Sequence, residues 1–197
     1  MPIAWCDHGI KKIKATAMKR SPLKIKQRVQ ELFFLISPPP HIMSDVSVLK
    51  DDVQFLVGHE LDDRYAKARI PLFKYNDEHI DDIVQHVAGK AAHFKPFNVF
   101  IKNLNVFHHG SGRTIYLDIV NKYPIRDIFE KLVKEDINYT PHISIAKNIG
   151  AEDFLKCWAY LKDLSYSQHF LCDRITVLAR SEKRWIHYSD IQFGGHH

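Results

Sequence analysis

A histidine and a serine lie two positions apart in the segment TPHISIAK (residues 140–147), within a run that otherwise has the composition of a buried strand. Residues two apart on a β-strand project from the same face, so His142 and Ser144 point the same way, with Ile143 and Ile145 packed behind them. An imidazole can exchange a proton near neutral pH, and a hydroxyl can donate a hydrogen bond beside it. The segment therefore predicts one polar strand face that could carry acid–base chemistry.

The chain nearly repeats this segment earlier, as KARIPLFK at residues 67–74. An offset of 73 residues places Arg69 at the position of His142 and Pro71 at that of Ser144. Arginine keeps its proton at neutral pH and cannot be a second base, but its guanidinium is well suited to grip an oxyanion in bidentate fashion. Proline in a strand marks an edge or a bulge. The repeat thus predicts a second polar strand face with a different chemistry.

The segments around these two strands alternate between strand-like and helix-like patterns. Apolar periodicity, turn residues and acids in first helical turns indicate where each element lies. The expected elements, in chain order, are a strand at 31–37, a helix at 42–58, a strand at 68–75, a helix at 77–94, strands at 97–107 and 113–120, a helix at 124–135, a strand at 142–148, a helix at 151–164, and strands at 173–181 and 184–193.

Both halves of the chain have the order β-α-β-α-β with a further closing strand, which marks a duplicated fold. We therefore expect an α+β protein of bilobal, pseudo-symmetric architecture, in which two duplicated β-α-β-α-β lobes with antiparallel-rich sheets face a central cleft. The domain would span residues 29–193, with interleaved lobes at approximately 31–112 and 113–193 and a tail at 194–197. Each lobe would present its own residue pair to the shared cleft.

The basic residues are concentrated at the N-terminus. Residues 1–28 contain eight Lys or Arg and one acid, Asp7, for a charge of +7, and since the total is +5 the rest of the chain carries −2. The functional interpretation of this arm, expected to be flexible, is an electrostatic tether for RNA or another polyanion. The alternatives are a solvated leader without a binding role, or a chain that starts at Met18.

The remaining composition narrows the class of protein. With 45% hydrophobic and 26% charged residues, the chain can bury a core and is not a disordered tail. The three cysteines do not suit a disulfide scaffold, and the longest apolar run, Leu32–Ile36, is too short to span a membrane. No histidine has carboxylate or cysteine partners at metal-ligand spacing, so no metal is expected. We expect a cytoplasmic monomer without a cofactor, a membrane association or an obligate protein partner.

Residues 31–193 resemble the 2H phosphoesterase superfamily, the LigT-like or 2′-5′ RNA ligase-like proteins. The resemblance rests on PHISIAK after an apolar helix, on the closing hairpin ITVLARSEKRWIHYSDIQF, and on the spacing of the repeat. That family has two H-x-[ST] motifs, one in each lobe. The resemblance implies that two histidines exchange protons while a 2′,3′-cyclic or 2′-5′ phosphodiester opens or closes, and that hydroxyls hold the phosphate oxygens. Here the second motif is intact and the first has lost both functional residues.

Two functions follow from the resemblance. In the first, the protein is an enzyme that acts on RNA or nucleotide phosphodiesters, with His142 as an acid–base group and Ser144 holding the phosphate. In the alternative, it is a catalytically degenerate module that binds a nucleotide or an RNA end, because Arg69 and Pro71 replace the first histidine and threonine. A scaffold with a vestigial cleft is the third possibility.

Further residues could complete such a cleft. Arg69 and Lys147 would contact phosphate through their charges, and Tyr116 and Trp185 could stack a base. His41 or His59 could replace the missing base if the fold brings either one into the cleft.

Overall fold

The computed structural model describes residues 31–61, 63–76, 80–133, 138–182 and 184–194. The basic arm at residues 1–28 and nearly all of the tail at 194–197 lie outside these residues. In chain order the elements are β1 (Leu32–Ile36), α1 (Pro40–Val57), β2 (Ile70–Tyr75), α2 (Ile80–Ala91), β3 (Phe97–His109), β4 (Gly112–Ile119), α3 (Lys122–Val133), β5 (His142–Ile149), α4 (Ala151–Leu161), β6 (Ser167–Cys172), β7 (Arg174–Ser181) and β8 (Arg184–Gln192). Within the described part of the chain, no helix is long and apolar enough to cross a membrane.

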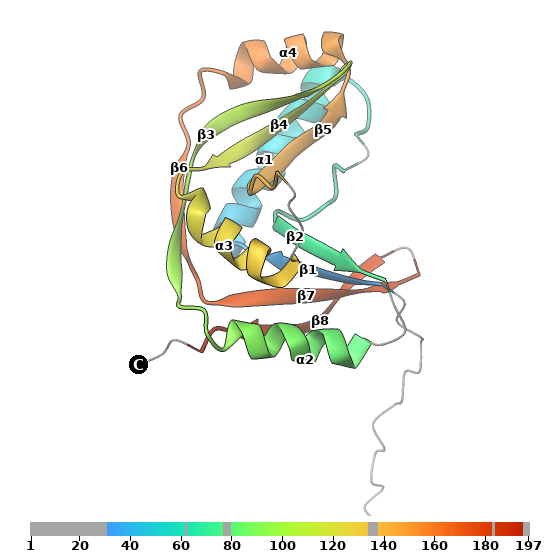
Figure 1. Ribbon diagram of the computed structural model, residues 1–197. Coiled ribbons are helices and arrows are strands. Elements are labelled where there is room, and N and C mark those ends of the chain that lie inside the picture. The colour runs from blue at the N-terminus through green and yellow to red at the C-terminus, as the bar shows by residue number, and fades with distance from the viewer. Residues whose placement is uncertain (1–30, 62, 77–79, 134–137, 183, 195–197) are drawn as a thin grey trace, which may run out of the picture.

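Two antiparallel four-stranded sheets form the frame of the fold (Figure 1). The first sheet has the strand order β2-β1-β7-β8, and the second has the order β5-β4-β3-β6. β2 and β5 are the edge strands at equivalent positions, with β1 and β4 next to them. The α+β, bilobal and duplicated architecture is thereby confirmed, and both strands that carry the repeated segment are edge strands.

The two sheets interleave along the chain. β3 and β4 are neighbours in the second sheet, while β7 and β8 return to the first sheet beside β1. A boundary between residues 112 and 113 therefore falls within the pair formed by β3 and β4 and does not separate the sheets. The first sheet takes its strands from both ends of the described chain.

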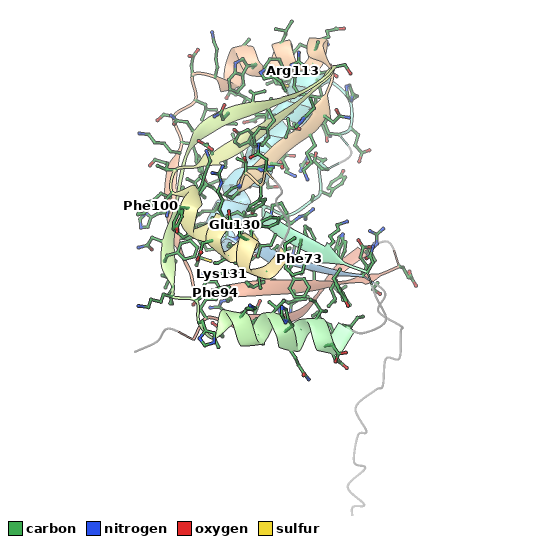
Figure 2. The ribbon with its side chains drawn as sticks, in the orientation of Figure 1. Phe73, Phe94, Phe100, Arg113, Glu130 and Lys131 are labelled. Carbon is green, nitrogen blue, oxygen red and sulfur yellow. The ribbon has the colours of Figure 1, made fainter. Side chains whose placement is uncertain are left out.

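The helices that follow β1 and β4 cover the opposite sheet. α1 packs against β5 and α4, and α3 packs against β2 and α2. α2 packs against β8 of the first sheet, the sheet that also contains β2, the strand before this helix. α4 packs against β4 of the second sheet, which also contains β5, the strand before it. Figure 2 shows Lys131 of α3 close to Phe94, just beyond α2, and its Nζ lies 5.9 Å from the centre of that ring. Each lobe is thus built from parts of both halves of the chain.

The sequence of α1 explains its limits and its orientation. Pro40 takes the first helical position, where its missing N–H costs no hydrogen bond. Gly58 ends the helix at φ 77°, a left-handed conformation that favours glycine. The buried residues recur every three or four positions along one face: Ile42, Val46, Leu49, Lys50, Val53 and Val57. This apolar stripe packs on the second sheet, and it contains one lysine.

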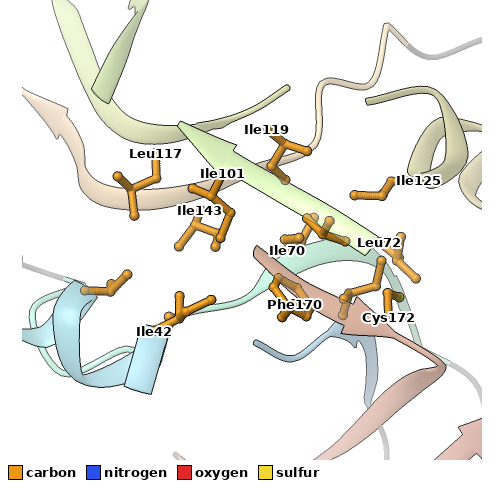
Figure 3. Packing of buried hydrophobic residues seen from close by; sticks show 14 of the residues in the cluster. Ile42, Ile70, Leu72, Ile101, Leu117, Ile119, Ile125, Ile143, Phe170 and Cys172 are labelled. Atoms are coloured by element: carbon orange, nitrogen blue, oxygen red, sulfur yellow. The ribbon is translucent and has the colours of Figure 1, made fainter. Parts of the chain in front are cut away.

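One hydrophobic core joins the two lobes. Figure 3 shows side chains from both sheets and from two helices in a single cluster, including Ile42 of α1, Ile125 of α3, Ile70 of β2 and Ile143 of β5. All four side chains have 0% exposure. Full burial of one such side chain contributes about 1.5–3 kcal/mol of hydrophobic free energy. The shared core holds β2 and β5 in a defined relation to one another.

Candidate functional site

β2 and β5 contact each other across the junction of the two sheets and contain β-bulges at equivalent positions. In β2, the pairing with β1 skips Leu72, the residue after Pro71. In β5, the pairing with β4 skips Ile145, the residue after Ser144. The two skipped residues are separated by the same 73 positions as the repeat read from the sequence. The matching bulges therefore support the register that places Arg69 opposite His142.

Each bulge brings a lysine onto the face of its strand that carries the motif residues, because the extra residue shifts the side-chain alternation. Arg69 and Lys74 both lie over the ring of Phe33, with cation-to-centre distances of 5.3 and 5.6 Å. Lys147 lines the same cavity as Ser144. The two edge strands thus turn cations from both lobes toward one place.

A small cavity of about 40 Å³, which we term the anion pocket, opens between the two motif strands and α1. Its lining residues are Phe33, Lys50, Asp63, Ala66, Lys67, Arg69, Pro71, Ser144 and Lys147. Four of these side chains are cationic and one is a carboxylate, so positive charge prevails. The volume has room for one or two water molecules, and the lining favours a small anionic group.

Lys50 reaches the anion pocket from the buried stripe of α1. The residue is 3% exposed, and its Nζ donates hydrogen bonds to the backbone oxygens of Asp63 at 2.7 Å and Ala66 at 2.9 Å. The same Nζ lies 3.8 Å from Oδ2 of Asp63. Burial lowers the pKa of Lys50, the Asp63 carboxylate opposes this, and the charges of Arg69 and Lys147 lower it further. Lys50 therefore ties the turn before β2 to α1 while adding charge to the pocket.

Arg69 and Lys147 face the anion pocket from opposite lobes. Within the described residues Arg69 makes no ion pair, and its Nη1 donates a hydrogen bond to the backbone oxygen of Lys67 at 3.4 Å. Burial lowers the pKa of the Arg69 guanidinium, which stays charged at neutral pH. Burial also lowers the pKa of Lys147, and the neighbouring charges of Arg69 and Lys74 lower it further against the pull of Asp63. An anion between the two strands would relieve this repulsion.

His142 begins β5 with one ring nitrogen fixed. Its Nδ1–H donates to the backbone oxygen of Thr140 at 2.7 Å, since a carbonyl oxygen can only accept. The imidazole meets the rings of Phe107 and Tyr116 edge-on, with centres 5.0 and 5.2 Å apart. Burial lowers the pKa of His142, the Thr140 hydrogen bond opposes this, and the charge of Lys147 lowers it further. In the neutral ring, Nε2 is therefore the proton acceptor.

The two aromatic candidates lie on different sheets. Tyr116 is 4% exposed and stacks on Phe107, with ring centres 4.0 Å apart. Trp185 packs against Phe33 at 5.4 Å, and the Nζ of Lys74 lies 5.1 Å from the centre of its ring. Neither ring lines the anion pocket. Tyr116 supports the imidazole from behind, and base stacking by either ring stays a prediction.

The histidines considered as a replacement base lie elsewhere. His41 is exposed in the first turn of α1. His59 donates from Nε2 to Oδ2 of Asp153 at 2.9 Å, which links the end of α1 to the start of α4. Among the residues that the structure describes, no imidazole lines the anion pocket, and His142 lies beside it rather than in it. Neither His41 nor His59 is placed to act as a base there.

Three charged residues of the anion pocket, Lys50, Asp63 and Lys67, were not expected from the sequence. Lys50 had a detectable signal, because it follows Val46 by four positions and precedes Val53 by three, inside the apolar stripe of α1. A lysine at such a position is buried and needs partners. Asp63 and Lys67 lie between α1 and β2, where no periodicity marks them.

Paired motif strands at the edges of two duplicated antiparallel sheets define a 2H phosphoesterase type of fold. The sequence profile of the 2′-5′ RNA ligase superfamily matches residues 70–184, more than half of the chain. The chain therefore belongs to the 2′-5′ RNA ligase superfamily, and the resemblance inferred from its motif residues is confirmed.

Solved structures share this fold at low sequence identity. The protein TT0787 of Thermus thermophilus matches with a TM-score of 0.61 and 14% identity over 85% of this chain and 100% of that protein. E. coli LigT in its apo form matches with a TM-score of 0.57 and 11% identity over 83% of this chain and 97% of LigT. E. coli LigT complexed with 3′-AMP gives 0.53 and 10%, over 83% and 98%. No curated protein matches the sequence at a significant level.

We expect His142 and His59 to titrate on opposite sides of the usual histidine value of about pH 6.5. Burial lowers the pKa of His142, whereas the hydrogen bond to Asp153 raises the pKa of His59. Imidazole ¹H–¹⁵N spectra recorded from about pH 5 to 8 would give both midpoints. Because the unfolded chain binds the His142 proton more tightly, the stability tied to this group should increase as pH rises through the interval below about 6.5. A His142 midpoint above that of His59 would contradict the described geometry.

Proposed function

We propose that this protein binds the phosphate of a nucleotide or of an RNA end in the anion pocket, and that it turns such ligands over slowly or not at all. One observation carries the proposal: four cationic side chains and the hydroxyl residue Ser144 line a single pocket, which no described imidazole lines. Arg69 stands where the repeat places the other histidine. The site thus keeps the groups that hold phosphate and lacks one of the two that would exchange protons.

A phosphate oxygen finds complementary partners on both strands. The Arg69 guanidinium can donate two parallel hydrogen bonds, and Lys147 adds a point charge from the other lobe. The Ser144 hydroxyl can donate to a third oxygen. Pro71 has neither a backbone N–H nor a hydroxyl to offer, so the first motif strand holds phosphate through the Arg69 guanidinium. Among these groups and His142, only the imidazole exchanges protons near neutral pH.

Structures with the same fold support this class of ligand. E. coli LigT has been solved in complex with 3′-AMP, with NADP+, with ATP and with phosphate. All of these ligands contain phosphate groups. The common fold and the cationic lining together favour a phosphate-bearing nucleotide as the ligand of the present chain.

A second candidate function is slow hydrolysis of a 2′,3′-cyclic phosphodiester with His142 as the single base. The hydrogen bond from Nδ1–H to Thr140 favours it, because Nε2 of the neutral ring remains free to take a proton. Burial also lowers the pKa of His142, so the ring is neutral at physiological pH. Hydrolysis that requires His142 in the unchanged chain would favour this candidate over binding alone.

Replacing Arg69 with glutamine should weaken the binding of 3′-AMP at least about fivefold, because one charge-assisted phosphate contact is lost. The difference in affinity should also shrink at higher salt, because added ions screen the Arg69 charge. Titration calorimetry at two salt concentrations measures both effects. Arg113→Gln is the matched control, because Arg113 donates to the backbone oxygens of Gly110 and Gly112 at the far end of the second sheet (Figure 2). Equal affinities for the unchanged chain and Arg69→Gln would remove Arg69 from the site.

A further inference from the structure

A second, larger cavity adjoins the anion pocket. It measures about 440 Å³ and lies between α1 and the segment from Arg64 to Ala68. Three residues line both cavities: Lys50, Ala66 and Lys67. Six residues of α1 line it, and five of them recur at the helical spacing of one face: Pro40, Met43, Ser44, Ser47 and Lys50, with Val46 as the sixth. The volume lies in the range of small-molecule sites, and this cavity, which we term the groove, shares those three residues with the anion pocket.

Tyr65 gives this groove an aromatic surface. The residue is 78% exposed although it lines a cavity, and the guanidinium of Arg64 lies over its ring at 5.4 Å from the centre. Arg64 is itself held by an ion pair with Asp51 of α1. An exposed ring beside cations is the arrangement that nucleic-acid-binding proteins use to stack a base.

The segment that carries Tyr65 is ordered by contacts of its own. The backbone N–H of Arg64 donates to the backbone oxygen of Leu61, and the backbone N–H of Ala66 donates to the backbone oxygen of Asp63, both at 3.0 Å. Lys50 fixes both ends of the second turn through the backbone oxygens of Asp63 and Ala66. A ring on a turn that is already ordered loses little conformational entropy when it binds a ligand.

We propose that this groove binds the nucleoside attached to the phosphate in the anion pocket, with the base stacked on Tyr65. The inference rests on the proposed phosphate-binding function and narrows its ligand to a nucleotide or RNA end that carries a base. The hydroxyls of Ser44 and Ser47 can make hydrogen bonds to the sugar or the base edge. Free phosphate would use the anion pocket alone.

The test compares 3′-AMP with inorganic phosphate by titration calorimetry on four proteins: the unchanged chain, Tyr65→Ala, Tyr65→Phe and Tyr123→Ala. Tyr65→Ala should weaken 3′-AMP binding about fivefold to tenfold and leave phosphate binding unchanged, because only the stacking contact is lost. Tyr65→Phe should bind 3′-AMP like the unchanged chain. Tyr123 on α3 is equally exposed, at 78%, and does not line the groove, so Tyr123→Ala should change neither affinity.

Three outcomes would overturn this inference. Unchanged 3′-AMP affinity in Tyr65→Ala would show that the base lies elsewhere while phosphate binding stands. An equal loss for 3′-AMP and phosphate would show that the ring only shapes the turn. If neither ligand binds the unchanged chain, the phosphate-binding function fails and this inference fails with it.

Discussion

The double variant Arg69→His, Pro71→Thr should hydrolyse 2′,3′-cyclic mononucleotides at least about tenfold faster than the unchanged chain. The two residues lie on or beside the edge strand β2 at the repeat positions of His142 and Ser144, and a bulge follows each pair. An imidazole at position 69 could exchange protons where the guanidinium cannot. One positioned acid–base group contributes about 10²–10⁴ in rate, so a tenfold gain is a conservative expectation.

The strand can accept both changes. Pro71 lies on an edge strand, and its backbone oxygen accepts a hydrogen bond from the hydroxyl of Tyr139 at 2.8 Å. Threonine retains that backbone oxygen and adds a hydroxyl. Because the variant loses the guanidinium that grips phosphate, KM should rise together with kcat.

The assay measures nucleotide hydrolysis between about pH 6 and 8, with His142→Ala added to the double variant as control. The third substitution should abolish the gain. Robust hydrolysis by the unchanged chain would contradict the proposal that it binds without efficient turnover. A folded but inactive double variant would count against the repeat register.

Replacing Lys50 with methionine should lower the free energy of unfolding by about 3 kcal/mol. Methionine keeps much of the buried volume of lysine but removes three donor hydrogens. The backbone oxygens of Asp63 and Ala66 would lose their partner. Within the described residues, Oδ2 of Asp63 is buried without a hydrogen bond, and its ion pair there is with Lys50 at 3.8 Å, so the carboxylate would lose this pair.

Urea unfolding followed by circular dichroism measures this loss. Lys131→Met is the matched control: its ammonium lies 2.7 Å from Asp127 on the exposed surface of α3, and its removal should cost less than about 1 kcal/mol. Adding Asp63→Asn to Lys50→Met should recover part of the loss, because the unpaired charge is then removed. Equal stabilities for the two single lysine variants would show that Lys50 does not hold the turn to α1.

The strands that carry the site could be predicted because their signal is local. Ile143 and Ile145 alternate with His142 and Ser144, and both isoleucines are buried while the polar pair is half-buried. The same alternation, displaced by 73 residues, was enough to set the register of the repeat. β6 was missed for the opposite reason. In this six-residue edge strand only Phe170 and Cys172 are buried, so its apolar pattern is too weak to detect.

The anion pocket could not be predicted because its residues meet through the tertiary fold. Lys50 comes from α1, Asp63 from the turn before β2, and Lys147 from β5 in the other sheet. Nothing in the sequence indicates that α1 crosses to the second sheet, since its apolar stripe would fit either one. The groove beside Tyr65 depends on the same crossing.

The crossing of α1 and α3 also bears on how such a chain could have arisen. A protein made of one half alone would lack the strand and helix of the other half against which its crossing helix packs. Such an ancestor would have had to associate with a second copy and exchange helices with it, as domain-swapped dimers do. Once duplication joined the copies, a substitution in one half no longer changed the other. The two motif positions differ accordingly: Arg69 and Pro71 occupy them at the start of β2, and His142 and Ser144 occupy them in β5.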